Sequence, residues 1–530
     1  MDINNISMSS QAIQNTENLS PLTAACEKSA ANPFDTAHLK ADIKGRSVRG
    51  GAVTIAAQGV KLILQTSSTA ILARLLTPAD FGLIAMVSVF TEFVNLFKDL
   101  GLSMATIQKK DITHQQVSTL FWVNIAMSCL LMLIATAISP FIARFYGEPR
   151  LMLITIAIGC TFIFGGLIAQ HTALMRRQMH FRTLAVIEIV AMAASIAAAV
   201  IAAFSGLTYW SLVIMLAVRG FISVVMVWSL SPWRPGKPAR GSGVRPMLAF
   251  GGSLTGSKIL DFFTRNGDNV IIGYALGSAS LGIYTKAYAL LTLPMSQING
   301  PLRSIMIPAL SRLQDEPDRY RRYYLQTLAA IAMITMPLVT FLFVSADEIV
   351  DILLGSQWTA VVTTFRWLVP AAFLGAINFA PDWLFVSLGR AGAQFRWTIL
   401  SAPVIVVGFL IGIHWGINGV AASVSVTWSL MFILSIYWAT RRSPIRFYDF
   451  IKALSVPVVS SLMAALAAAL VGRFVLESNI IVRLAAYCLT FAVCYFCCVL
   501  ATSTGRQLVR SMINAISTLR AKPAITTITK

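Results

Sequence analysis

Apolar stretches of about twenty residues recur along almost the whole chain, separated by short polar segments. A helix of about 20 residues spans the hydrocarbon core of a bilayer, which is roughly 30 Å thick. The pattern predicts fourteen membrane-spanning helices, centred near residues 63, 92, 127, 160, 194, 218, 261, 292, 335, 375, 404, 428, 462 and 490. We therefore expect an all-α polytopic membrane protein.

The seventh stretch, LAFGGSLTGSKILDFFTRNGDNVIIG (248–273), carries four charged residues. Lys258, Asp261, Arg265 and Asp268 fall within roughly 80° of arc at 100° per residue, on one helix face. Each charge at the centre of a membrane helix costs about 2.5 to 3.5 kcal/mol on insertion scales. This face is therefore expected to turn toward other protein or water, enclosed by the remaining helices.

Polar segments divide the chain. Residues 1–47 are rich in Ser, Asn and Thr and show neither the basic nor the apolar region of a signal peptide, which predicts a disordered cytoplasmic tail. The basic, Pro- and Gly-rich segment 231–246 reads as a cytoplasmic linker between two bundles. The predicted parts are six-helix bundles at 48–230 and 247–440, two accessory helices at 441–502 and a basic cytoplasmic tail at 503–530.

The two bundles resemble each other at an offset of 200 residues. The segment ADFGL (79–83) falls on ASLGI (279–283), and Gly82 falls on Gly282. In the same register Gln58, Lys61, Gln65 and Ser68 fall on the four charged positions of the seventh stretch. Six spans separate the copies, so both run in the same direction, as in parallel-repeat membrane proteins.

Composition and charge support the membrane class and give an orientation. The mean hydropathy is +0.72 and 56% of the residues are hydrophobic, which excludes an ordinary soluble domain. The net charge of +20 could suggest nucleic acid as a partner, but 19 Lys and Arg residues lie in every second loop and only five in the opposite loops. This asymmetry predicts that both termini are cytoplasmic and excludes a nucleic-acid partner.

Residues typical of enzymes or metal sites are missing from the sequence pattern. The five histidines are dispersed, and the seven cysteines suggest no disulfide framework. GGSLTGSK (251–258) resembles a phosphate-binding loop only superficially, because it lies in a membrane span and its Lys does not follow a Gly. We expect no enzymatic activity, no metal and no cofactor.

Cations on the two repeated helices are the candidate substrate-binding residues. Facing each other, Lys61, Lys258 and Arg265 would form a cationic cavity suited to a phosphate or diphosphate group. Arg303 and Arg366 are second-rank candidates. Asp261 and Asp268 could bind a coupling proton or Na⁺, or they could only balance the charge of Arg265 and its neighbours.

Several segments also resemble a known family. These are ARLLTPADFGL (73–83), Asp268-Asn269 with IIGYALGSASLGIYTKAYAL (271–290), and IMIPALSRLQ (305–314) followed by RYRRYYL (319–325). They are similar to the Wzx-type polysaccharide flippases of the MOP superfamily, within the subgroup of colanic acid and succinoglycan exporters.

The resemblance, which covers roughly residues 48–500, implies a V-shaped transporter of the bacterial inner membrane. Such a protein moves undecaprenyl-diphosphate-linked oligosaccharides by alternating access, with Lys61, Lys258 and Arg265 expected around the diphosphate. It implies membrane lipid, a polysaccharide polymerase and export machinery as partners, and it leaves open whether Asp261 and Asp268 bind H⁺ or Na⁺ as a coupling ion or only balance charge. Two alternatives stay open: a small-molecule antiporter of the MATE type, and a membrane polysaccharide polymerase.

Overall fold

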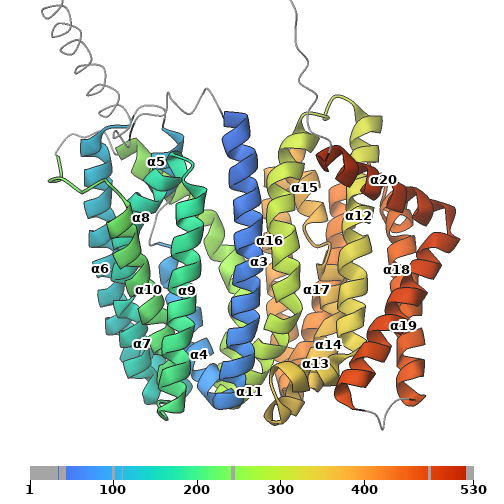
Figure 1. The fold of residues 1–530 in the computed structure, drawn as a ribbon, viewed down its shortest axis with the longest axis horizontal. Helices are drawn as coiled ribbons and strands as arrows, with labels where there is room; N and C mark the ends of the chain where they lie inside the picture. The colour runs from blue at the N-terminus through green and yellow to red at the C-terminus, as the bar shows by residue number, and fades with distance from the viewer. Residues whose placement is uncertain are drawn as a thin grey trace, which may run out of the picture. The chain divides into compact units, whose positions relative to one another are not determined.

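The computed structural model describes residue 34 and residues 43–97, 102–109, 112–239, 245–474 and 479–520. Within helices, side chains are described except at residues 43–49, 102, 105, 108, 245–261, 263, 293–305, 512 and 515–520. Every regular element in the described ranges is a helix (Figure 1), so the all-α prediction is confirmed. Most of the predicted tail 1–47 lies outside the described residues, and so does the segment 240–244 of the predicted linker.

The chain forms two compact units. The first comprises Met1–Gln65 and Phe90–Ile259. It contains, in whole or in part, α3 (Ile43–Leu75), α4 (Pro78–Asn95), α5 (Leu102–Gln108), α6 (His114–Tyr146), α7 (Arg150–Cys160), α8 (Phe162–Arg177), α9 (Phe181–Phe204), α10 (Trp210–Leu230) and the start of α11 (Arg245–Ser311).

The second unit comprises Thr66–Val89 and Leu260–Lys530. It takes the end of α3, most of α4 and the larger part of α11. Its other elements are α12 (Pro317–Val344), α13 (Ala346–Leu353), η3 (Ser356–Trp358), α14 (Thr359–Gly375), α15 (Ala380–Ser387), α16 (Ala391–Gly412), η4 (Ile413–Trp415), α17 (Gly416–Thr440), α18 (Phe447–Phe474), α19 (Ile480–Ala501) and α20 (Ser503–Arg520).

Nine helical stretches in the described ranges are long and apolar enough to cross a membrane. One of them, Ala391–Thr440, has 50 residues and contains both α16 and α17. Helices α3 and α11, where the first and seventh spans are predicted, are not among these nine. The protein is therefore a multi-pass membrane protein, and the count of fourteen spans stays a prediction.

The internal repeat appears in the backbone. The break between α3 and α4 falls at Leu76 and Thr77, and α11 breaks 200 residues later at Gly277, where φ is 79°. A positive φ of this kind favours glycine. Each half of the repeat thus consists of a long helix, a sharp break and a second helix.

Two glycines related by the repeat make equivalent contacts. A Cβ built on Gly82 would lie 1.7 Å from the carbonyl oxygen of Ser278, and one built on Gly282 would lie 1.9 Å from that of Pro78. Residue 78 corresponds to residue 278 at the offset of 200, so the contact has approximate two-fold symmetry. Small residues of this kind let two membrane helices approach closely.

Residues 231–239, the described part of the predicted linker, are hydrogen-bonded to the start of α6 in the first unit. The Trp122 indole Nε1 donates to the carbonyl oxygen of Gly236 at 2.9 Å, and the Gly236 amide donates to Ser118 Oγ at 2.9 Å. His114 Nε2 lies 3.1 Å from the carbonyl oxygen of Arg234. Residues 231–239 are therefore held in place at the end of α10.

In the second unit, α18 and α19 pack against α12 (Figure 1). Met333 of α12 is surrounded by aromatic side chains of α19, and the Tyr495 hydroxyl donates to the Met333 carbonyl oxygen at 2.8 Å. Arg321 at the start of α12 pairs with Asp449 of α18 at 2.5 Å. The two helices predicted as accessory are thus joined to the bundle by both apolar and polar contacts.

Candidate substrate site

Lys61, the predicted cation of the first repeat, forms an ion pair inside the first unit. Its Nζ lies 2.6 Å from Glu188 Oε2 of α9. The Lys61 side chain is 19% exposed and that of Glu188 is 45% exposed. The pair is therefore covered on the lysine side and accessible on the carboxylate side, which leaves room for another group to approach.

The sequence around these two residues explains why they meet. Lys61 lies on the polar face of α3, while Glu188 interrupts the otherwise apolar run AVIEIVAM of α9. A single charge in a membrane helix is costly unless it is paired or faces water. Lys61 and Glu188 therefore neutralise each other, which lowers the cost of placing both charges in the membrane.

Asp268, the last charge of the seventh predicted span, is buried in the second unit. The Tyr284 hydroxyl donates to its Oδ2 at 2.7 Å, and the backbone N–H of Asn269 donates to its Oδ1 at 2.8 Å. The ring of Tyr288 stacks on that of Tyr284 at 6.3 Å. The carboxylate is thus held by two donors of α11 itself, one on each side of the Gly277 break.

Lys286 lies on the same helix, beyond the break. Its Nζ is 3.6 Å from the centre of the Phe81 ring of α4, a distance typical of a cation–π interaction. The lysine therefore joins α11 to α4, next to the close glycine contact. No role for Lys286 follows from the sequence alone.

The other predicted site residues have different surroundings. Arg265 is exposed on α11, and Arg366 of α14 pairs with Asp347 of α13 at 2.5 Å. Lys258, Asp261 and Arg303 lie on α11, but their side chains are outside the described part of the structure. Lys61 and Lys258 belong to the first unit, whereas Arg265, Asp268, Arg303 and Arg366 belong to the second. The common cavity predicted for them therefore stays a prediction.

Three partners were not predicted: Glu188, Tyr284 and Asp347. Glu188 could have been found, because an unexplained carboxylate within a span calls for a cation. Tyr284 has no such signal, because a tyrosine 16 residues from Asp268 is not on a neighbouring helical turn. Asp347 belongs to a short helix outside the predicted spans.

Among the described residues, no group of three or more His, Cys, Asp or Glu side chains could hold a metal ion. Cys494, Cys497 and Cys498 follow one another along α19 as free thiols. The polar groups that the structure does bring together are single ion pairs and hydrogen bonds. Such groups can bind a charged ligand electrostatically.

Solved structures of transporters share this fold. "Lipid II flippase MurJ, inward closed conformation" matches with a TM-score of 0.65 and 12% identity, over 84% of this chain and 98% of that one. A multidrug resistance MATE family transporter of the MOP superfamily, in an inward-facing conformation, matches with a TM-score of 0.58 and 14% identity, over 74% of this chain and 96% of that one.

Curated relatives bear names from polysaccharide synthesis. The teichuronic acid biosynthesis protein TuaB of Bacillus subtilis (strain 168) is 26% identical over 63% of this chain and 70% of its own length. The lipopolysaccharide biosynthesis protein WzxC of Escherichia coli (strain K12) is 24% identical over 67% and 73%. The succinoglycan biosynthesis transport protein ExoT of Rhizobium meliloti (strain 1021) is 24% identical over 84% and 90%.

The sequence model of one family also matches, over residues 71–363, which is more than half of the 530 residues. Its description is "Polysaccharide biosynthesis protein". This agrees with the resemblance to Wzx-type flippases and with the MOP-type fold. The chain belongs to this polysaccharide biosynthesis protein family.

Proposed function

We propose that this protein flips undecaprenyl-diphosphate-linked oligosaccharide repeat units across the bacterial inner membrane, for exopolysaccharide, capsule or lipopolysaccharide synthesis. The observation that carries the proposal is the family match over residues 71–363, joined to the fold of a lipid II flippase. A lipid II flippase acts, by its name, on a lipid-linked substrate. The protein is proposed to be a transporter and not an enzyme, with both termini in the cytoplasm.

The proposed mechanism is alternating access. The lipid tail stays in the bilayer while the diphosphate and the sugars pass through a polar interior between the two repeated halves. Lys61, Lys258 and Arg265 are proposed to hold the diphosphate, with Arg303 and Arg366 as second-rank contacts. The accessible Glu188 partner of Lys61 supports this role, because an incoming diphosphate could replace one carboxylate contact by stronger charge-assisted hydrogen bonds.

Asp268 is proposed to bind the coupling ion, H⁺ or Na⁺, with Asp261 as the alternative. Its burial and its hydrogen bond from Tyr284 keep a titratable group away from bulk water.

Asp268→Asn preserves the shape of the side chain but removes its charge, whereas Tyr284→Phe removes only the hydrogen-bond donor. If Asp268 couples transport to an ion gradient, Asp268→Asn should abolish gradient-driven flipping in proteoliposomes and Tyr284→Phe should weaken it. Equal rates with and without a gradient in the unsubstituted protein would rule coupling out.

The function is tested by deleting the gene. Lipid-linked repeat units should then accumulate on the cytoplasmic leaflet. Arg265→Ala should reproduce the block at normal expression. Arg265→Lys should restore polymer export in part, because lysine keeps the positive charge but lacks the bidentate guanidinium fork. Full polymer export in the Arg265→Ala strain would remove that residue from the site.

A MATE-like small-molecule antiporter is the second candidate, favoured by the fold match to the multidrug transporter. It predicts altered drug susceptibility on deletion, without accumulation of lipid-linked sugars. A polysaccharide polymerase is a weaker candidate, because the outward connections described at 147–149, 205–209 and 413–415 are short and the longer one at 345–358 is mostly taken up by α13 and η3. A polymerase and export machinery are instead proposed as partners that act on the flipped product.

A further inference from the structure

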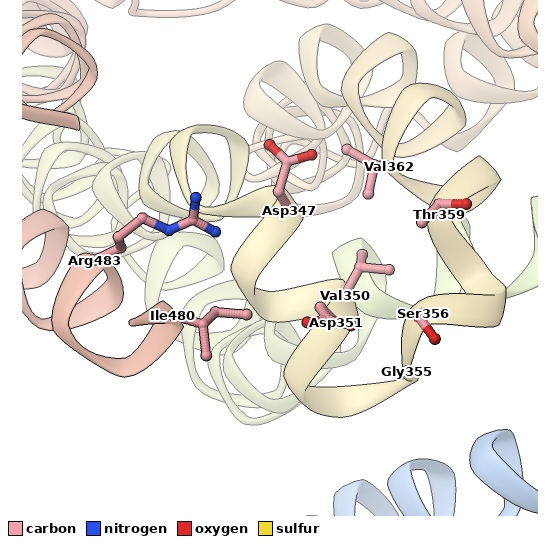
Figure 2. A pocket seen from close by; sticks show the side chains of 9 residues that line it. All are labelled: Asp347, Val350, Asp351, Gly355, Ser356, Thr359, Val362, Ile480 and Arg483. Carbon is pink, nitrogen blue, oxygen red and sulfur yellow. The ribbon is translucent and has the colours of Figure 1, made fainter. Parts of the chain in front are cut away.

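A small cavity lies where three segments of the second unit meet: α13 with the turn after it, the start of α14 and the start of α19 (Figure 2). Its volume is about 330 Å³, at the lower end of the range for small-molecule pockets. Under the predicted topology it opens on the extracytoplasmic side, because α12 ends and α19 begins at loops poor in Lys and Arg. The proposed mechanism touches it only through Asp347, the partner of Arg366, and gives its other wall residues no role.

The cavity wall contains both signs of charge. Asp347 and Asp351 are four residues apart on α13 and so share a face of that helix, while Arg483 comes from α19. Arg483 Nη2 lies 3.2 Å from Oε1 of Glu348, whose side chain is only 4% exposed. This buried carboxylate ties the start of α19 to α13 and holds the guanidinium at the cavity.

Three of the polar groups in the wall are not used by the fold. The side chains of Asp351, Ser356 and Thr359 form no hydrogen bond or ion pair with any other residue that the structure describes. A carboxylate and two hydroxyls together offer several acceptors and two donors. All three side chains are exposed, so the cavity presents hydrogen-bonding groups on three elements that a ligand can reach.

Between these polar groups the wall is aliphatic, formed by Val350, Val362 and Ile480 (Figure 2). Asp347 already pairs with Arg366, and Arg483 pairs with Glu348. Among the charged groups of the wall only Asp351 forms no ion pair with a described residue, and its carboxylate repels anions. An uncharged ligand with several hydroxyl groups needs no counter-charge and meets no such repulsion. It can donate to the carboxylates, accept from the guanidinium, and place an apolar C–H face on the aliphatic side chains. We infer that this cavity binds a neutral sugar unit.

The inference rests on the proposed function, in which an oligosaccharide emerges at this end of the protein. The segment 347–362, which supplies most of the cavity wall, is also joined to the helix that carries Lys61. Arg74 Nη2 of α3 donates to the carbonyl oxygen of Ile352 at 2.8 Å, and the Trp358 indole donates to that of Ala73 at 2.8 Å. A sugar bound here would therefore contact an element that is hydrogen-bonded to the end of α3.

The test is saturation-transfer difference NMR on the full-length protein in lipid nanodiscs. The probes are galactose, glucose and maltotriose, with glucuronate, inorganic phosphate and Ca²⁺ as charged competitors. At least one neutral probe should receive saturation, and the double variant Asp351→Ala, Thr359→Ala should reduce that signal at least fivefold. Thr359→Ser keeps the hydroxyl and should retain most of it. Asp315→Ala, which removes an exposed carboxylate outside the cavity, is the matched control and should retain all of it.

No transfer to any neutral probe, or equal transfer in the double variant, would overturn the inference. Displacement of the neutral probe by phosphate or Ca²⁺ at equal concentration would overturn it as well, since it would make the cavity an ion site. The proposed function is read out separately. If lipid-linked units accumulate in the deletion strain but the purified protein binds no sugar, only this inference is wrong. If lipid-linked units do not accumulate, the proposed function is wrong, whatever the cavity binds.

Discussion

At the level of single residues, the roles of Lys61 can be separated by exchanging charges. Lys61→Ala should lower polymer export at least tenfold at equal protein level, because it removes a proposed phosphate ligand. In the double variant Lys61→Glu, Glu188→Lys the ion pair is kept but the cation moves to α9. We expect this variant to remain defective. Export restored by the exchange would mean that the pair is only structural.

The turn between α6 and α7 gives a pH-dependent prediction. Arg150 Nε and Nη2 donate to the two carboxylate oxygens of Glu148, each at 2.8 Å. These hydrogen bonds, with the charge of Arg150, hold the pKa of Glu148 below its ordinary value of 4.5. Because the folded-state pKa is the lower one, the stabilisation is complete above pH 4.5 and is lost as the pH falls further.

The pair lies at the surface, so it is expected to contribute only about 0.2 to 1 kcal/mol. Glu148→Gln should therefore lower the thermal stability of the purified protein slightly at pH 7. The difference between the two proteins should shrink as the pH falls below 4.5. A difference of the same size at pH 7 and pH 4 would contradict this explanation.

At the level of elements, the glycine contact between α4 and α11 determines how closely these helices pack. Gly82→Ala would place a methyl group 1.7 Å from the Ser278 carbonyl oxygen, so the backbones would have to separate. Overpacking of this kind is expected to cost about 1 to 3 kcal/mol or more. Gly282→Ala should have a similar effect, because the contact is nearly two-fold symmetric.

Size-exclusion profiles and thermal unfolding in detergent would measure these effects. Gly51→Ala is the matched control, since nothing lies within 4 Å of a Cβ at Gly51 of α3. It should leave stability unchanged or slightly higher, because alanine favours the helix. Unchanged stability of both Gly82→Ala and Gly282→Ala would disprove the close contact.

At the level of the whole molecule, we expect α18–α20 to be needed for a stable bundle. A chain ending at Thr440 would lose the Arg321–Asp449 pair and the aromatic side chains that cover Met333. The shortened protein should aggregate on extraction, as seen by size-exclusion chromatography. Tyr495→Phe, which removes one hydrogen bond worth about 1 kcal/mol, should remain monodisperse. A single sharp peak from the shortened chain would show that these helices are dispensable.

The sequence by itself determined the membrane class, the all-helical fold and the duplicated helix pair. Hydropathy is read locally and reflects the bilayer, so it needs no knowledge of packing. The offset of 200 residues also predicted that Gly82 and Gly282 are equivalent. Only the structure shows that the two form reciprocal contacts with Ser278 and Pro78.

The tertiary structure alone decided which groups are partners. Lys61 and Glu188 are separated by 127 residues, and the cavity joins Asp347 to Arg483, so no local periodicity could connect them. Sequence shows that a charge inside a bilayer requires a partner, because an unpaired charge there is costly. The choice of that partner depends on which helix faces pack together, and this is settled by side-chain shapes across the whole bundle.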